Sequence, residues 1–91
     1  MIGVTERARK ELKRILSTNV DMPQARLRLI PGDQGELGLG IDIESPEDQI
    51  VEYKGSRVLV VEHRLAASLR GIMLDVDDTP EGPQLVIAQG S

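Results

Sequence analysis

The sequence predicts an α+β fold, in which two helices pack on mixed or antiparallel β-strands. Apolar residues recur at helical spacing in an N-terminal segment and in a short segment near residue 65. Much of the remaining chain alternates apolar and polar residues with the two-residue period of a β-strand. These strand segments follow one another without regularly alternating helices, which favours α+β over a doubly wound α/β fold.

The first helix is expected over residues 5 to 18. Its apolar stripe consists of Val4, Ala8, Leu12, Ile15 and Leu16. Thr5 can cap the N-terminus, and Lys13 and Arg14 suit the last turn of a helix. Pro23 cannot continue a helix, so the helix should end before it.

Two strands are expected on either side of a glycine-rich loop. The segments ARLRLI (residues 25–30) and LGLGIDIE (residues 37–44) alternate apolar and polar positions. Each should therefore form an antiparallel strand with one wet face. In the loop, Gly32 or Gly35 should adopt a positive φ, while Gly38 and Gly40 should let a neighbour pack closely on the second strand.

The middle of the chain predicts a hairpin. The segment IVEYKGSRVLVVE (residues 50–62) should turn near Lys54-Gly55. Its second strand is apolar on both faces from Val58 to Val61, which is typical of a central strand.

The C-terminal part predicts a helix and two strands. EHRLAASLRG should form a short helix ending near Gly71, with Leu65, Ala66 and Leu69 on one face. IMLDVD (residues 72–77) and QLVIA (84–88) should be strands, joined by a DTPEGP loop.

The composition argues against several classes of partner. The 91 residues suit one domain, residues 1–91, and 11 basic against 15 acidic residues give a net charge of −4. Phosphate contacts need clustered Lys and Arg, so we expect no nucleic-acid partner. The apolar runs are far shorter than a membrane span, and the N-terminus has no signal-peptide core. We therefore expect a cytoplasmic protein with no membrane partner.

The lack of cysteine narrows the chemistry further. The chain contains no cysteine, which excludes disulfides, thiolate metal sites and a cysteine nucleophile. The glycine-rich loop GDQGELGLG has no Lys followed by Ser or Thr, so it is not a phosphate-binding P-loop. We interpret it as a turn.

Two further groups of residues have both a catalytic or metal-binding and a structural interpretation. His63, the only histidine, could be a general base, but a solvated or capping role fits its place at the start of the short helix better. Carboxylates occur in two clusters, where they could hold Ca²⁺ or Mg²⁺ or simply be solvated. The clusters are Asp42, Glu44, Glu47 and Asp48, and Asp75, Asp77, Asp78 and Glu81.

The order of the elements and several phrases resemble the HesB-like family, also called A-type iron–sulfur carriers or IscA-like proteins. The phrases are, in chain order, IGVTERA, LRLI, LGIDIES, VEYKGSRVLVVE and LRGIMLDVDD. The resemblance spans nearly the whole chain and implies a HesB-like fold, with self-association into a homo-oligomer.

The resemblance also implies a site. The family's cluster ligands are three cysteines, one in the loop after the first strand and two in a C-terminal tail, because thiolates suit iron–sulfur clusters. The loop position corresponds here to Asp33 or Gln34, and the chain ends at VIAQGS without the tail pair. The loop residues Asp33, Gln34 and Glu36 are therefore the candidate binding residues, with no metal or other cofactor expected.

Three hypotheses of function follow. The leading one is a non-enzymatic, cysteine-less HesB-like protein that acts through contacts with unidentified protein partners, linked to iron–sulfur cluster assembly. The alternative is a module that binds a ligand or a hard cation with the 31–36 loop and acidic residues. The third is an enzyme that uses His63 and nearby carboxylates.

Overall fold

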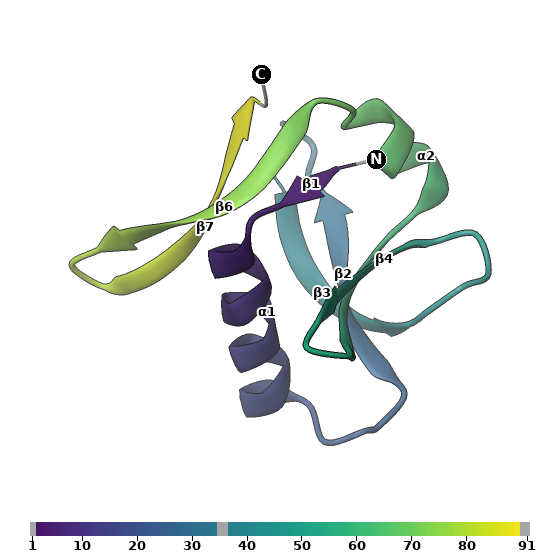
Figure 1. Ribbon diagram of the computed structural model, residues 1–91. Coiled ribbons are helices and arrows are strands. Elements are labelled where there is room, and N and C mark those ends of the chain that lie inside the picture. Colours follow the sequence, from purple (N-terminus) through teal and green to yellow (C-terminus); the bar gives the residue numbers. More distant parts are fainter. Residues whose placement is uncertain (1, 35–36, 90–91) are drawn as a thin grey trace.

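The computed structural model describes residues 2–34 and 37–89. Two helices and seven strands alternate unevenly along the chain (Figure 1). In chain order they are β1 (Gly3–Val4), α1 (Glu6–Asn19), β2 (Ala25–Pro31), β3 (Leu37–Ile43), β4 (Gln49–Tyr53), β5 (Ser56–Val61), α2 (His63–Ser68), β6 (Ile72–Thr79) and β7 (Gly82–Gln89).

The strands form two mixed sheets. One has four strands in the order β3-β2-β5-β4, and the other has three in the order β1-β6-β7. The β2–β5 and β1–β6 pairs are parallel, and the remaining pairs are antiparallel. Figure 1 shows α1 beside both sheets, and it contacts strands β4, β5 and β6. The predicted α+β class is confirmed.

The hydrophobic core lies between α1 and the two sheets. Leu12, in the middle of the predicted stripe of α1, is fully buried. It belongs to a cluster with aliphatic residues of both sheets, which are Leu27, Leu29, Val51, Leu59, Leu74 and Val76 among others. The chain has no Phe or Trp, so this core consists of aliphatic side chains. No helix in the described part of the chain is both long and apolar enough to cross a membrane.

Thr5 caps α1 as predicted. Its hydroxyl oxygen accepts a hydrogen bond from the Ala8 backbone N–H at 3.2 Å and donates one to the Asp75 carboxylate at 2.7 Å. The helix ends at Asn19, before Pro23 as predicted, but the predicted basic last turn is wrong, because that turn has no basic residue. Arg14 instead forms an ion pair with Glu11, one turn earlier.

The central hairpin is confirmed. Lys54 and Gly55 both have positive φ, at 50° and 81°, which is the geometry of a tight type I′ turn. All four residues from Val58 to Val61 are buried, and β5 lies between β2 and β4. The apolar residues on both faces of this segment thus correctly predicted a central strand.

The predicted DTPEGP loop is wrong, because most of it belongs to strands. Strand β6 continues to Thr79 and β7 begins at Gly82, leaving a two-residue turn of Pro80 and Glu81. The Thr79 hydroxyl donates to the Gly82 carbonyl at 2.7 Å, and Gly82 has a φ of 116°. This local closure lets the two strands pair along their whole length.

The glycines around the 31–36 loop follow the predictions only in part. Gly32 has no positive φ, so that prediction is wrong for this residue, and Gly35 lies outside the described residues. The Ile30 side chain lies directly over Gly40, where a β-carbon would collide with it, so the predicted close approach is confirmed there. Gly38 has only an ordinary contact with a backbone oxygen at 3.9 Å.

Strand β3 departs from the predicted burial of its apolar face. It is an edge strand, and the main contacts of α1 are with the other strands β2, β4, β5 and β6. Ile41 and Ile43 are each 58% exposed, although they share a face with the buried residues Ala25 and Leu27. We call these two exposed side chains the β3 patch.

Candidate functional site

The predicted binding loop follows the C-terminal end of β2. Asp33 and Gln34 form a turn immediately after this strand, and both are exposed. Glu36, the third predicted residue, lies outside the described residues. The structure therefore does not bring the three candidates together into a described site.

A surface hollow of about 620 Å³ lies between the base of this loop and the start of α2. Its walls include Ile30 and Pro31 from β2, and Glu62 and His63 at the start of α2. A second hollow of about 520 Å³ adjoins it and also has His63 in its lining. Neither hollow is lined by Asp33 or Gln34.

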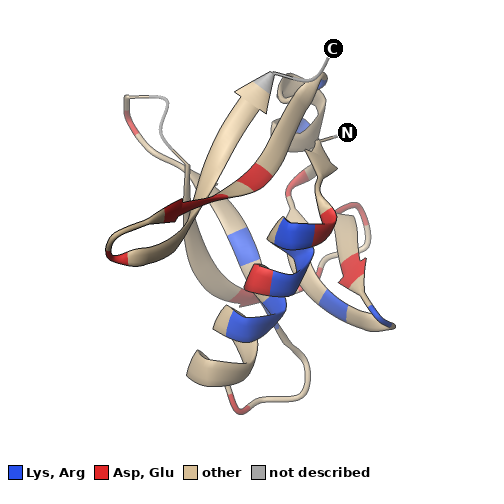
Figure 2. Cartoon of the chain, turned by 60° about the vertical axis from the view of Figure 1, so that its left-hand side comes forward, with Lys and Arg blue, Asp and Glu red and all other residues tan. Residues whose placement is uncertain are grey.

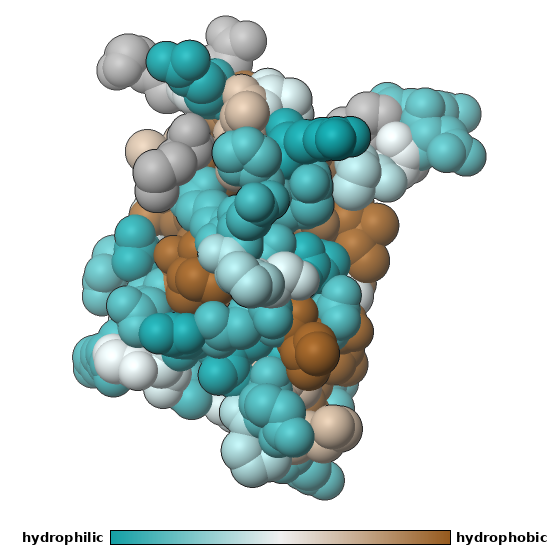
Figure 3. All heavy atoms as spheres, turned by 90° about the vertical axis from the view of Figure 1, so that its right-hand side faces the viewer, coloured by the Kyte–Doolittle hydropathy of each residue, from teal (hydrophilic) through white to brown (hydrophobic). Residues whose placement is uncertain are grey.

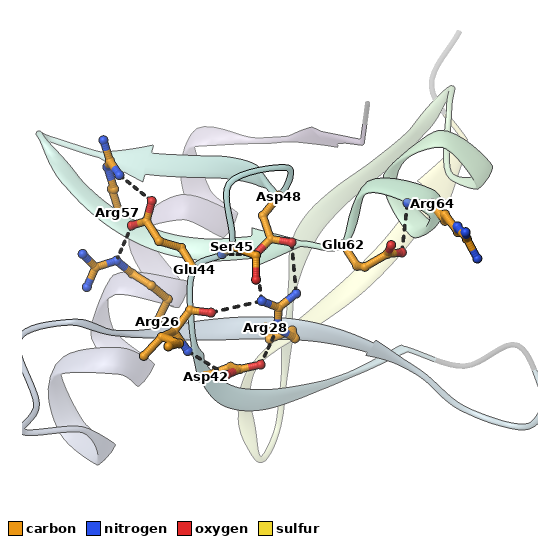
Figure 4. A network of polar contacts seen from close by, with 10 residues as sticks. Arg26, Arg28, Asp42, Glu44, Ser45, Asp48, Arg57, Glu62 and Arg64 are labelled. Carbon is orange, nitrogen blue, oxygen red and sulfur yellow. Dashed lines mark hydrogen bonds and ion pairs between the residues drawn. The ribbon is translucent and has the colours of Figure 1, made fainter.

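The first hollow contains a buried ion pair. The guanidinium group of Arg28 in β2 binds the Asp48 carboxylate with both Nη nitrogens, at 2.7 and 3.3 Å (Figure 4). The Arg28 Nε donates to Asp42 in β3 at 2.8 Å, and Nη2 also donates to the Ile43 carbonyl at 3.1 Å. The guanidinium thereby joins β2, β3 and the turn before β4.

Asp48 is held in its ionised form. Its side chain is only 3% exposed, and its Oδ2 also accepts the backbone N–H of Ser45 at 2.8 Å. The hydrogen bonds from Arg28 lower the pKa of Asp48, opposing the effect of burial, and Asp48 in turn raises the pKa of Arg28. A carboxylate with a lowered pKa and occupied lone pairs suits neither general acid–base catalysis near neutral pH nor cation binding.

Glu44 forms a second junction of the same network. It lies 2.5 Å from Arg57 in β5 and 3.5 Å from the Nε of Arg26 in β2, as Figure 4 shows. We call this set the arginine–carboxylate network, which comprises Arg26, Arg28, Asp42, Glu44, Asp48 and Arg57. It links β2, β3 and β5 with the turn before β4.

The structure does not place His63 where it could act as a general base. It is the exposed first residue of α2, and within the described residues it forms no hydrogen bond to a nucleophile or a carboxylate. The cap of α2 is Glu62, whose carboxylate accepts the backbone N–H groups of Arg64 and Leu65 at 2.9 and 3.0 Å. The capping interpretation of His63 is therefore wrong by one residue, and the solvated interpretation is confirmed.

The acidic residues near the end of β6 lie on different faces of the strand. Asp75 accepts hydrogen bonds from Thr5 and from the Val76 backbone, and the Thr5 hydroxyl lowers the pKa of this carboxyl. Asp78 points to the other face and pairs with Arg7 of α1 at 3.1 Å. Figure 2 shows these acidic positions of β6 beside the basic residues of α1. In the described part of the chain, no three His, Asp or Glu residues come close enough to hold a metal ion.

The donors near the loop do not suit an iron–sulfur cluster either. Such clusters are bound by several thiolates, and the chain supplies none. The hollow beside the loop offers one exposed imidazole and four carboxylates, of which Asp42 and Asp48 are bound by Arg28 and Glu62 caps α2. We therefore derive no cluster chemistry for this chain.

The comparisons with known proteins concern the fold. No protein-family model matches the chain, and neither does any curated protein sequence. A crystal structure of IscA with the [2Fe–2S] cluster has a TM-score of 0.64 and 21% identity, covering 98% of this chain and 85% of that chain. Escherichia coli SufA, described as involved in the biosynthesis of iron–sulfur clusters, has a TM-score of 0.70 and 15% identity, covering 97% and 84%. The solution structure of a protein from Aquifex aeolicus has a TM-score of 0.60 and 26% identity, covering 97% and 90%.

These similarities extend over almost the whole chain, as does the resemblance in sequence. The three solved structures agree in fold with the two-sheet arrangement described above. The chain therefore has the HesB-like fold of the A-type iron–sulfur carriers, without a single cysteine.

Proposed function

We propose that this protein takes part in iron–sulfur cluster assembly without catalysis and without holding a cluster, by binding other proteins of that process. One observation carries the proposal. The chain shares its fold, over 98% of its length, with IscA bearing a [2Fe–2S] cluster, yet it has no thiolate ligand. Fold alone does not define function, so the proposed link depends on the partner experiment below.

The β3 patch is the surface best suited to a protein partner. Ile41 and Ile43 expose more than half of their surface, side by side on one face of an edge strand. Met22 adds a third exposed apolar side chain, at 59%, three residues before β2. On the side of the molecule that Figure 3 draws, apolar residues are exposed in small groups between polar residues. Burying such side chains against another protein is favourable, because it removes apolar surface from water.

The site geometry supports the non-enzymatic part of this proposal. His63 has no partner that would activate it among the described residues, and Asp48 is fixed in an ion pair with Arg28. Arg28 binds both Asp42 and Asp48, and among the described residues no three His, Asp or Glu side chains come close enough to hold a metal ion. We therefore advance no second function.

The experiment uses IscA carrying its [2Fe–2S] cluster as the probe. We expect a complex with this protein in size-exclusion chromatography at about 100 μM of each, where a contact of about −5.9 kcal/mol is half saturated. The visible absorption of the cluster should stay with IscA when the complex is separated. The variant Ile41→Lys should weaken the complex, because it places a charge in the β3 patch.

The matched control is Val86→Lys, which places the same charge on an edge strand of the other sheet, β7, and should leave the complex intact. Failure to form any complex at this concentration would contradict the proposal. Transfer of the cluster to this chain would contradict it as well.

A further inference from the structure

Another surface hollow, of about 420 Å³, lies at the opposite end of β2 from the 31–36 loop. Its walls come from the last turns of α1, the segment between α1 and β2, the start of β2, and the turn between β4 and β5. Neither His63 nor any described residue of the loop lines it. It is therefore a different place from the two hollows beside α2.

Basic side chains from three elements meet in this hollow, which we call the basic hollow. They are Lys13 of α1, Arg26 of β2 and Arg57 of β5. Among the described residues, the Lys13 ammonium makes no hydrogen bond or ion pair, and the Nη2 nitrogen of each arginine makes no hydrogen bond. Three cationic groups are therefore left with donors for a ligand.

Glu44 and two backbone carbonyls hold the arginines in place without using all of these donors. The Glu44 carboxylate pairs with Nη1 of Arg57 and lies 3.5 Å from Nε of Arg26, and Figure 4 shows it between the two side chains. Nη1 of Arg26 donates to the carbonyls of Pro23 and Ala25, at 2.8 and 3.0 Å. The Arg26 side chain is only 19% exposed. Its guanidinium is thus already fixed before a ligand arrives, which lowers the entropy cost of binding.

The other walls of the basic hollow indicate the class of ligand. Ser17 and Ser56 add hydroxyl groups beside the cations, and Leu16 and Val20 add apolar surface. Asp21 is the single carboxylate residue in the lining, so the three basic side chains favour an anion. A volume of about 420 Å³ also leaves room for an organic body beside the anionic group.

We propose that the basic hollow binds a small phosphate monoester, whose phosphoryl oxygens accept hydrogen bonds from Lys13, Arg26 and Arg57. A phosphate monoester offers three strong acceptor oxygens, whereas a carboxylate offers two. Three cationic side chains that approach from three elements therefore match the phosphate better, and guanidinium groups suit its geometry. This inference goes beyond the proposed function and depends on neither a protein partner nor iron–sulfur clusters.

Two features limit the affinity of this site. Glu44 and Glu52 both pair with Arg57, so they offset part of the positive charge. The carbonyl end of α1 also carries a partial negative charge. Because the contacts are partly exposed and screened, we expect half saturation at about 1–5 mM.

Phenyl phosphate serves as the probe, because it joins a phosphate group to a small apolar body. We expect saturable changes in the NMR signals of the Gly55 and Ser56 backbone N–H groups, which lie in the lining, at constant ionic strength. The signals of Asp33 and Gln34, beyond the other end of β2, should not change. Benzoate has the same ring but a carboxylate, and should bind at least about fivefold more weakly.

A pair of lysine variants locates the site. Lys13→Gln removes a cation that has no ion pair among the described residues, so it should fold and should weaken binding about fivefold. The matched control is Lys10→Gln, which removes the same charge from an exposed position of the same helix outside the basic hollow. It should leave the affinity unchanged.

Three results would overturn the inference. The first is the absence of saturable changes at about 20 mM phenyl phosphate, well above the expected half saturation. The second is equal weakening by Lys13→Gln and Lys10→Gln, which would show only general attraction of an anion to basic residues. The third is equal affinity for benzoate, which would show that the phosphate group is not what the hollow recognises.

Discussion

Arg28 and Asp48 form a two-point ion pair across 20 residues of sequence, with Nη–Oδ distances of 2.7 and 3.3 Å. Both side chains are largely buried, at 17% and 3% exposure. The pair holds the turn before β4 against the outer face of β2. Because both charges are partly removed from water, each depends on the other for stabilisation.

Replacing one partner should therefore destabilise the fold. We expect Asp48→Asn to lower the free energy of unfolding by about 3 kcal/mol, because Arg28 would lose its buried counter-charge and keep only Asp42. The matched control is Asp42→Asn. Asp42 is 51% exposed, so its pair with Arg28 should contribute about 1 kcal/mol or less. Urea unfolding of both variants measures the difference, and equal losses would show that burial does not set the strength of these pairs.

The same pair should make stability depend on pH. The pKa of Asp48 is lowered in the folded protein, so its contribution is present above the unfolded value of about 3.9 and is lost as the pH falls through the folded value. Glu11 and Asp75 also have lowered pKa values, but they are present in both proteins and their effects cancel in the comparison. The stability difference between the unmodified protein and Asp48→Asn should therefore be smaller at pH 3 than at pH 7. A constant difference would mean that Asp48 titrates alike in the folded and unfolded states.

The hairpin turn offers a stabilising substitution. Lys54 has a φ of 50°, a conformation that costs an ordinary residue about 1–2 kcal/mol and that Asn adopts more readily. The Lys54 ammonium also lies 5.3 Å from the centre of the Tyr53 ring, a contact worth about 0.5–1 kcal/mol at an exposed site. The backbone term is the larger of the two, so Lys54→Asn should raise the free energy of unfolding by about 0.5 kcal/mol.

Lys54→Ala is the control for that prediction. It removes the contact with Tyr53 but keeps a residue that disfavours positive φ, so thermal unfolding should show a loss of stability. A destabilised Lys54→Asn would mean that the ring contact outweighs the backbone strain.

The core prediction concerns Leu12. This side chain is fully buried between α1 and both sheets, so Leu12→Ala should cost about 2–5 kcal/mol through lost burial and a residual cavity. Ile41→Ala removes a similar volume from an exposed site and should cost less than about 0.5 kcal/mol. Denaturant unfolding that gave less than about 0.5 kcal/mol for Leu12→Ala as well would show that α1 contributes little to the core.

The elements that depend only on residues close together in the sequence were predictable. The stripe around Leu12, the cap at Thr5 and the turn at Lys54-Gly55 each depend on signals within a few residues. Strand β1 was missed for the opposite reason. Two residues, Gly3 and Val4, become a strand only because they pair with Met73 and Leu74 of β6. No local pattern contains that information.

In the candidate site, too, features set by neighbouring residues were predictable, and contacts between distant residues were not. The sequence pattern placed Arg26, Arg28 and Asp42 on the solvent-facing side of β2 and β3. It did not predict which residues they pair with. Arg28 meets Asp48 only because a turn folds back over the sheet, and this contact occupies the carboxylates that could otherwise have bound a cation. The exposure of Ile41 could not be predicted either, because it depends on the place of β3 at the edge of the sheet, away from the main contacts of α1.

Because the chain has no thiolate ligand, the protein should lack the visible absorption of an iron–sulfur cluster. We expect the purified protein, incubated anaerobically with iron and sulfide and then desalted, to show no charge-transfer absorption. Its remaining donors are carboxylates and one imidazole, which suit hard cations or isolated Fe²⁺ better than a sulfide-bridged cluster. The reductant must be dithionite, because small thiols could themselves supply ligands, and IscA treated in the same way serves as the positive control. A stoichiometric cluster that survives desalting on this chain would show that the fold can hold one without cysteine, and the proposal that it acts only through protein contacts would then be wrong.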